Sequence, residues 1–284
     1  DLVTLCAACE RLAERVQFHR FIQWQFDRQW RALREHARHL DIELIGDMPI
    51  FVAHDSVEVW QSRGQFLLHH DGRLQVQAGV PPDYFSATGQ LWGNPLYDWE
   101  RMGRDGFQFW RARARRALRL FDRVRIDHFR GFCAHWEIPG DATTAIKGRW
   151  APVPGAAFFA ALADELGGPS VVAARFIAED LGIITADVDQ LRESTGLPGM
   201  RVLQFSFGDG DEARARPYAY PHNLVFYTST HDNDTLASWL RGDDVEQGGR
   251  SAAQAARERE NVMEYLGLPV EAAARDDSHL ALLR

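Results

Sequence analysis

Acidic side chains follow short apolar runs at four separate places in the chain. They are Asp47, Asp127, Glu179 and Asp232, in the runs 42–51, 123–132, 170–182 and 221–234, respectively. Short apolar runs are typical of strands buried in a parallel sheet, and in β/α proteins the C-terminal ends of such strands carry the active site. The pattern therefore predicts that several carboxyl groups converge at one edge of a sheet, where they can do acid/base and nucleophilic chemistry.

The run RVRIDHFRGF (123–132) has the alternation of a strand with one charged face. Val124 and Ile126 point to one side, whereas Arg123, Arg125 and Asp127 point to the other. An unpaired buried carboxylate would take up a proton, but an arginine two residues away on the same face keeps it ionised and oriented. We therefore interpret Asp127 as a catalytic carboxylate.

The chain offers three candidate acids, Asp127, Glu179 and Asp232, and no cofactor motif. Cleavage of a glycosidic bond requires this combination. A retaining mechanism needs a nucleophilic carboxylate and a second carboxyl, roughly 5 to 5.5 Å away, that acts first as an acid and then as a base. Glu179 ends an apolar run and is the better candidate for an acid with a raised pKa. Asp127 is the better nucleophile, and Asp232 could bind sugar hydroxyls more tightly in the transition state.

Two histidines, His128 and His231, each adjoin a candidate acid. We expect them to hydrogen-bond a substrate hydroxyl rather than serve only as strand-end packing. A metal site is not expected, because the chain has no His-x-His pair and the HDND run at 231–234 has too few spaced carboxylates for a calcium loop. No GxGxxG or GxxxxGK[ST] motif occurs, so we expect no cofactor.

The stretch from 52 to 106 is irregular and punctuated by Gly and Pro, which predicts an inserted subdomain. Its loop at 79–99 is too long for a simple connection unless it is functional, and it is rich in aromatic residues. We expect Tyr84, Phe85 and Trp92 to contribute to a binding surface, although such rings can equally pack a small subdomain.

Charge and cysteine content limit the class of protein. The 284 residues carry a net charge of −8, which argues against nucleic acid or an anionic membrane surface as a partner and favours a neutral substrate. Three cysteines with no framework spacing make structural disulfides unexpected. No apolar run is long enough to span a membrane. We expect a cytoplasmic protein.

Helical and strand patterns alternate along the chain. Apolar periodicity predicts helices over 2–40, 107–120, 156–167, 186–195, 250–266 and 270–284, with strands in the four acid-bearing runs and at 199–207. Alternating β and α segments favour a β/α barrel. An open doubly wound sheet is the alternative, but it would call for a Gly-rich phosphate turn after its first strand.

Six blocks of the sequence resemble, in order, the signature segments of the amylomaltases, which are 4-alpha-glucanotransferases. They are DMPIFVAHDSVEVW, GVPPDYFSATGQLWGNPLYDW, RVRIDHFRGF, FIAEDLG, GMRVLQFSF and YTSTHDNDT. The resemblance implies a (β/α)8 TIM-type barrel and the transfer of α-1,4-glucan segments through a covalent glucosyl-enzyme intermediate. The implied partners are α-1,4-glucans and malto-oligosaccharides, with glucose as an acceptor.

The resemblance also implies roles for individual residues. By motif position Asp127 is the nucleophile, Glu179 the acid/base and Asp232 the transition-state stabiliser. Arg125 and His231 fall in the donor-sugar subsite, and Asp47 is a structural or substrate-side acid. The loop from Tyr84 to Trp92 corresponds to a lid that keeps water from the intermediate.

The chain departs from the family pattern in two respects. Ser229 stands where the family usually has glycine, and blocks expected before the first helix and after Arg284 are missing. We therefore expect 1–284 to be a partial catalytic barrel with about five of eight strands. An α-glucan hydrolase of the α-amylase clan, the clan that the resemblance implies, and a non-catalytic carbohydrate-binding remnant are the alternative functions.

Overall fold

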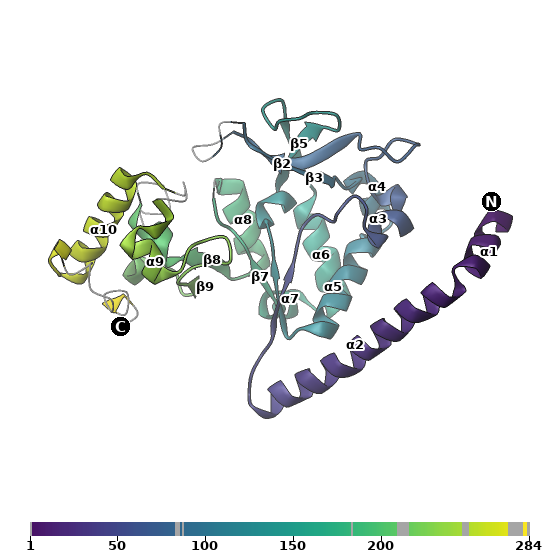
Figure 1. Ribbon diagram of the computed structural model, residues 1–284, viewed down its shortest axis with the longest axis horizontal. Coiled ribbons are helices and arrows are strands. Elements are labelled where there is room, and N and C mark those ends of the chain that lie inside the picture. The colour runs from purple at the N-terminus through teal and green to yellow at the C-terminus, as the bar shows by residue number, and fades with distance from the viewer. Residues whose placement is uncertain are drawn as a thin grey trace.

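Short strands that pair in parallel form the centre of the molecule (Figure 1). The computed structural model describes residues 2–82, 86, 88–182, 184–208, 216–245, 250–271 and 281–282. The central strands are β1 (Ile45–Met48), β4 (Arg123–Ile126), β7 (Phe176–Ala178), β8 (Gly199–Val202) and β9 (Leu224–Tyr227). They form a sheet in the order β1-β4-β7 and a parallel pair β8-β9. A hydrogen bond of 2.9 Å from Ala178 N to Pro198 O joins the two groups.

The alternation predicted for β4 is present in the structure. Val124 and Ile126 are buried, and Arg125 lies on the other face beside Asp47 of β1, its partner in the strand register. Gly46 on β1 has the ring of Phe121 so close behind it that a Cβ would lie 2.1 Å from a ring carbon. The register and this close packing fix β1 against β4.

Helices and aromatic side chains pack against the buried face of the strands. The helices α5 (Gln108–Leu120), α6 (Gly155–Leu166), α7 (Pro169–Arg175) and α8 (Ala186–Thr195) lie beside the strands in Figure 1. Trp110, Phe132 and Phe158 form the middle of this core, and the last two rings stack with centroids 4.9 Å apart. Burial of rings of this size is the main source of stability in such a core.

A smaller antiparallel sheet lies above one end of the central strands (Figure 1). Its order is β3-β2-β5-β6, and its strands are β2 (Val76–Val80), β3 (Gln90–Pro95), β5 (Ala134–Pro139) and β6 (Arg149–Pro152). The short helices α3 (Val57–Gln61) and α4 (Trp99–Arg104) accompany it. The inserted subdomain at 52–106 stays a prediction, and the small sheet takes two of its strands from after β4.

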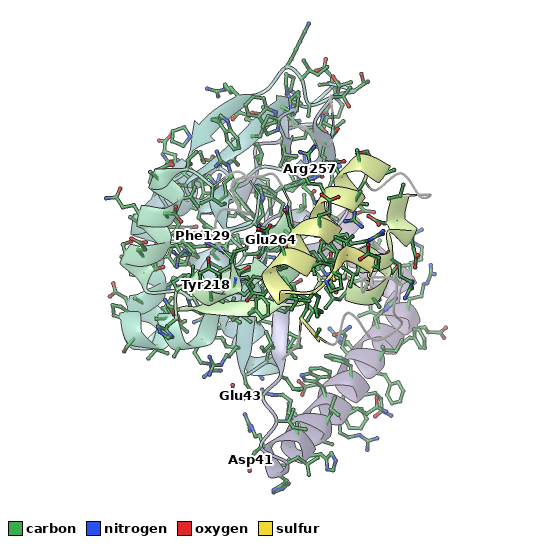
Figure 2. All side chains as sticks on the ribbon, turned by 90° about the vertical axis from the view of Figure 1, so that its left-hand side faces the viewer. Asp41, Glu43, Phe129, Tyr218, Arg257 and Glu264 are labelled. Carbon is green, nitrogen blue, oxygen red and sulfur yellow. The ribbon has the colours of Figure 1, made fainter. Side chains whose placement is uncertain are left out.

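A second hydrophobic cluster supports the last two central strands. It joins the 3-10 turn Leu203–Phe207 to α9 (Leu236–Arg241) and α10 (Ala252–Leu266) through Phe207, Trp239 and Met263. Figure 2 shows α10, with Arg257 and Glu264, nearest the viewer and Phe129 within the body of the molecule. The helix begins at a capping box in which Ser251 accepts a hydrogen bond from Gln254 N and the Gln254 side chain accepts one from Ser251 N.

The helix predictions hold better than the strand predictions. The helices expected at 156–167, 186–195 and 250–266 are α6, α8 and α10 to within two residues. The strand expected over 170–182 was wrong in its first half, because Pro169 starts helix α7 and only Phe176–Ala178 is extended. The strand expected over 199–207 ends at Val202 and continues as a 3-10 turn. Most of 270–284 lies outside the described residues.

The N-terminal helix is divided at Leu12 into α1 (Leu2–Arg11) and α2 (Ala13–His39) and extends away from the body (Figure 1). Figure 2 shows Asp41 and Glu43 at the turn that leads from α2 into β1. Among the described helices none alone is long and apolar enough to cross a membrane, and the pair α6–α7, bent by 95°, meets the length and composition test only jointly.

Asp122 ties α2 to the start of the central sheet. Its carboxylate accepts hydrogen bonds from Leu44 N at 2.9 Å and from the Arg34 guanidinium at 2.6 Å. Burial alone would raise the pKa of Asp122, but these two donors and the nearby Arg38 lower it below its ordinary value.

Asp122→Ala should lower the free energy of unfolding by about 1–3 kcal/mol at pH 7, because Leu44 N and Arg34 lose their acceptor. A lowered native pKa stabilises the fold above the pKa of the unfolded chain, and that contribution is lost as pH falls. The difference from wild type should therefore shrink below about pH 4. Urea denaturation at several pH values measures this difference in the free energy of unfolding. The control is Asp141→Ala, because Asp141 is exposed. Equal losses in both variants would contradict the prediction.

Candidate active site

The Arg125 guanidinium connects two acids of the predicted site, Asp47 and Asp127. It donates to both oxygens of Asp47, at 3.0 Å from Nε and 2.8 Å from a terminal nitrogen, and that terminal nitrogen also donates to Oδ1 of Asp127 at 2.9 Å. The Arg125 side chain is only 13% exposed, whereas Asp47 and Asp127 are about half exposed. The strand register brings Asp47 and Arg125 together, and the alternation of β4 adds Asp127.

Glu179 follows β7 immediately and is held by backbone donors. Its carboxylate accepts hydrogen bonds from His128 N at 2.7 Å and Leu181 N at 2.8 Å. Burial, together with the negative charge of Asp127, raises the pKa of Glu179 to about 7 in spite of these two donors. The side chain is therefore partly protonated at neutral pH, as a general acid requires.

The backbone around Glu179 continues the pairing of β4 with β7. Glu179 N donates to Ile126 O and Phe129 N donates to Glu179 O, both at 3.0 Å. Between them His128 adopts the left-handed conformation, with φ of 53°, which is uncommon for a residue other than glycine. This left-handed turn directs the His128 N–H toward the Glu179 carboxylate. The strained conformation thereby supplies one of the two hydrogen bonds that hold Glu179.

Asp127 lies in the combined field of three charged neighbours. Burial raises its pKa, the Arg125 guanidinium opposes that rise, and the carboxylates of Asp47 and Asp232 add to it. The effect of Asp232 shows that this acid is within electrostatic range of Asp127. Among the described residues, no hydrogen bond or ion pair links Asp232 directly to Asp127 or Glu179.

Asp232 and His231 lie on an exposed turn after β9. Their side chains are 80% and 70% exposed, and His231 Nε2 is 3.6 Å from Asp232 Oδ1. The turn is closed by the Asn233 side chain, which accepts hydrogen bonds from Thr230 N and Oγ1. These two residues thus lie near the group formed by Arg125, Asp47 and Asp127, the Arg125 group, but on a less buried segment.

Two predicted substrate-binding residues contact each other. The rings of Trp92 and His128 meet edge to face with centroids 4.9 Å apart, and Trp92 also packs on Phe51. Burial lowers the pKa of His128 to about 4, so its imidazole is neutral at pH 7. Its buried Nε2 has no hydrogen-bond partner in the described part of the chain. Tyr84 and Phe85 lie outside the described residues.

A cavity of about 390 Å³ opens beside the Arg125 group. It is lined by Ile45, Gly46, Asp47, Arg125, Met200, Tyr227, Ser229, Thr230 and His231. Tyr227 was not predicted as a site residue. Burial raises the pKa of its hydroxyl, and the charges of Arg125 and Asp47 act on it. Its position at the end of β9, directly before the acid-bearing turn, was the available signal.

Other features of the described residues lie away from this site. A larger hollow of about 560 Å³ among Arg63, Phe66, His69 and Arg101 contains none of the predicted site residues. Across the described ranges, no three His, Cys, Asp or Glu side chains gather as metal ligands. The candidate site therefore remains the group around Arg125.

Comparison with known proteins places the chain in a family. A family model described as 4-alpha-glucanotransferase matches residues 2–284. The chain belongs to this family. It is 55% identical over 232 residues to the 4-alpha-glucanotransferase of Thermus thermophilus, covering 81% of this chain and 45% of that protein. It is 41% identical over 261 residues to the Aquifex aeolicus 4-alpha-glucanotransferase, covering 92% and 50%, respectively.

Solved structures of family members agree with the mixed α/β fold. Amylomaltase from Streptococcus agalactiae in complex with acarbose superposes with a TM-score of 0.84 at 36% identity, over 96% of this chain and 53% of that one. Amylomaltase from Corynebacterium glutamicum, at 22% identity and a TM-score of 0.74, covers 93% and 39% and shows the fold alone. This 4-alpha-glucanotransferase family chain thus spans about half the length of its relatives.

The Glu179 carboxyl should titrate near pH 7 in this family member. Carbon-detected NMR on protein labelled with ¹³C at the glutamate carboxyl measures the midpoint, and the signal lost in Glu179→Gln identifies the residue. In Arg125→Gln the midpoint should move upward, because a nearby cation that favours the ionised form is lost. A Glu179 signal with the ordinary midpoint of about 4.3, or one unmoved by Arg125→Gln, would contradict this account.

Proposed function

We propose that this chain carries the catalytic centre of a glycosyltransferase that moves α-1,4-glucan segments between malto-oligosaccharides. The observation that carries the proposal is the pairing of two unlike carboxyl groups. Asp127 is held by the Arg125 guanidinium, and the adjacent Glu179 has a pKa raised by burial to about 7. Two acids whose environments separate their roles are the requirement of a retaining mechanism.

In the first step Asp127 attacks the anomeric carbon of the donor sugar. Its carboxylate forms a covalent ester with that carbon as the glycosidic C–O bond breaks, and protonated Glu179 gives its proton to the departing oxygen. In the second step Glu179, now ionised, takes the proton from a hydroxyl of the acceptor sugar. That oxygen then displaces Asp127, so a glycosidic bond re-forms with retained configuration.

The surrounding residues bind the donor sugar in this scheme. Arg125 and Asp47 line the cavity together with His231, which supports a donor-sugar subsite there. Asp232 would strengthen its hold on sugar hydroxyls as positive charge develops at the anomeric carbon. The neutral imidazole of His128, with its unpartnered Nε2, offers a further hydrogen bond to a hydroxyl.

The scheme places the site in a (β/α)8 barrel of which this chain supplies five strands. Support comes from the five parallel strands and from acids that follow β4, β7 and β9. The loop from Tyr84 to Trp92 would act as a lid that excludes water and favours a sugar acceptor such as glucose. The acarbose in the amylomaltase structure of Streptococcus agalactiae supports α-glucans as the substrate class.

Incubation with maltotriose tests the proposed reaction. The chain should produce glucose together with oligomers longer than three units, and Asp127→Asn should lower the rate by about 10³-fold or more because it removes the nucleophile. Glu179→Gln should accumulate a covalent adduct from a donor with a good leaving group, with mass spectrometry locating the label on Asp127. Only shorter sugars would indicate a hydrolase. Binding without turnover, unchanged in Asp127→Asn, would indicate a non-catalytic binding protein.

Trp92→Ala should increase hydrolysis relative to transfer by about threefold to tenfold. The substitution removes a ring that covers His128 and so admits water to the intermediate. The ratio of free glucose and reducing ends to longer oligomers, followed from a single donor, measures the change. Trp60→Ala is the matched control, since Trp60 on α3 is 75% exposed. An unchanged ratio in Trp92→Ala would remove Trp92 from the lid.

A further inference from the structure

Asp180 is a buried acid that the proposed reaction does not use. It follows Glu179 directly, yet its side chain is only 1% exposed. Oδ1 accepts a hydrogen bond from Met200 N at 2.6 Å, and Oδ2 lies 3.2 Å from Arg192 Nε and 3.4 Å from a terminal nitrogen of Arg201. The two acids are adjacent in the sequence but have opposite surroundings. Glu179 lies in the candidate active site, whereas Asp180 is buried against β8 and α8.

The contacts of Asp180 join β7 to β8. The backbone contributes a hydrogen bond from Ala178 N to Pro198 O, and the Asp180 carboxylate continues the connection to Met200 on β8. Gly199 permits the approach, because a Cβ there would lie 2.5 Å from Asp180 Oδ2. The Asp180 carboxylate thus occupies the space that a side chain at position 199 would fill. Its hydrogen bond with Met200 N takes the place of a backbone hydrogen bond between β7 and β8.

Glu179 is consequently held from two directions. On one side its backbone N–H and C=O pair with Ile126 and Phe129. On the other side the next residue, Asp180, is fixed to β8 and to helix α8 through Arg192. We propose that Asp180 is a positioning residue that orients the Glu179 carboxyl and offsets the positive charge of Arg192 and Arg201 next to it.

The charges around this pair determine the sign of the effect. Glu179 faces Asp127 and Arg125 from β4, while Asp180 faces Arg192 from α8 and Arg201 from β8. Arg192 is also near the exposed Asp189 and Glu193. Loss of the negative charge of Asp180 would leave the two guanidinium groups without the buried carboxylate that offsets them, and in this proposal their positive charge would then favour the ionised form of the adjacent Glu179. Glu179 would then be a poorer acid catalyst at neutral pH.

The test compares Asp180→Asn with Arg201→Gln, because the two changes shift the charge in opposite directions. In the ¹³C NMR titration the midpoint of Glu179 should fall by about half a unit to one unit in Asp180→Asn and rise by a similar or smaller amount in Arg201→Gln. For maltotriose, Asp180→Asn should lower kcat about tenfold to 100-fold with KM changed less than about twofold, since the acid is misplaced while the sugar subsites remain. Glu193→Gln, which removes an exposed acid near the same arginine, should leave both measurements unchanged.

The inference rests on the acid/base role proposed for Glu179, but the titration decides it separately. A Glu179 midpoint that stays at its wild-type value in folded Asp180→Asn would overturn it, as would equal shifts in Glu193→Gln. Arg201 is partly exposed, so Arg201→Gln keeps the test available if Asp180→Asn does not fold. In that case an unmoved midpoint in Arg201→Gln overturns the inference. Absence of transfer by the wild-type chain would instead count against the proposed function.

Discussion

The arrangement of the site depends on one guanidinium group that is shared by two carboxylates. Arg125 donates two hydrogen bonds to Asp47 and one to Asp127, which ties the C-terminal end of β1 to that of β4. A largely buried arginine cannot lose its charge, so it holds the two carboxylates close to it. The same cation also limits how far burial can raise the pKa of Asp127. Removing it would leave two neighbouring carboxylates to repel each other.

Glu179 shows the opposite balance, and the contrast between the two acids follows from their surroundings. It has two backbone donors but no direct ion pair among the described contacts, and burial outweighs the donors. The backbone bonds fix its position without adding a full positive charge. A carboxyl group can therefore be oriented and still hold a proton near neutral pH. The left-handed His128 is the local cost of directing one of these donors.

Much of this site was predictable from the sequence, because alternation in a strand determines which side chains share a face. The grouping of Arg125 with Asp127 followed from the two-residue spacing at the end of β4. The double hydrogen bond from Arg125 to Asp47 was not predictable, since it depends on the register between strands that lie 78 residues apart. The different roles of Glu179 and Asp180 were also hidden, because a sequence shows two acids but not the glycine on β8 that accommodates one of them. The short length of β7 was missed because valine and alanine before it suit a strand as well as a helix.

The three predicted catalytic acids are held with unequal rigidity, and this difference suits their proposed roles. Asp127 and Glu179 follow adjacent strands that are hydrogen-bonded to each other, so the distance between them is set by the sheet. Bond making and proton transfer both need that precision. Asp232 follows β9, which is separated from β7 by β8, and its side chain is largely exposed. The role proposed for Asp232, which is to hold sugar hydroxyls, tolerates a looser attachment, because a sugar bound in the cavity would itself complete the surroundings that this turn lacks.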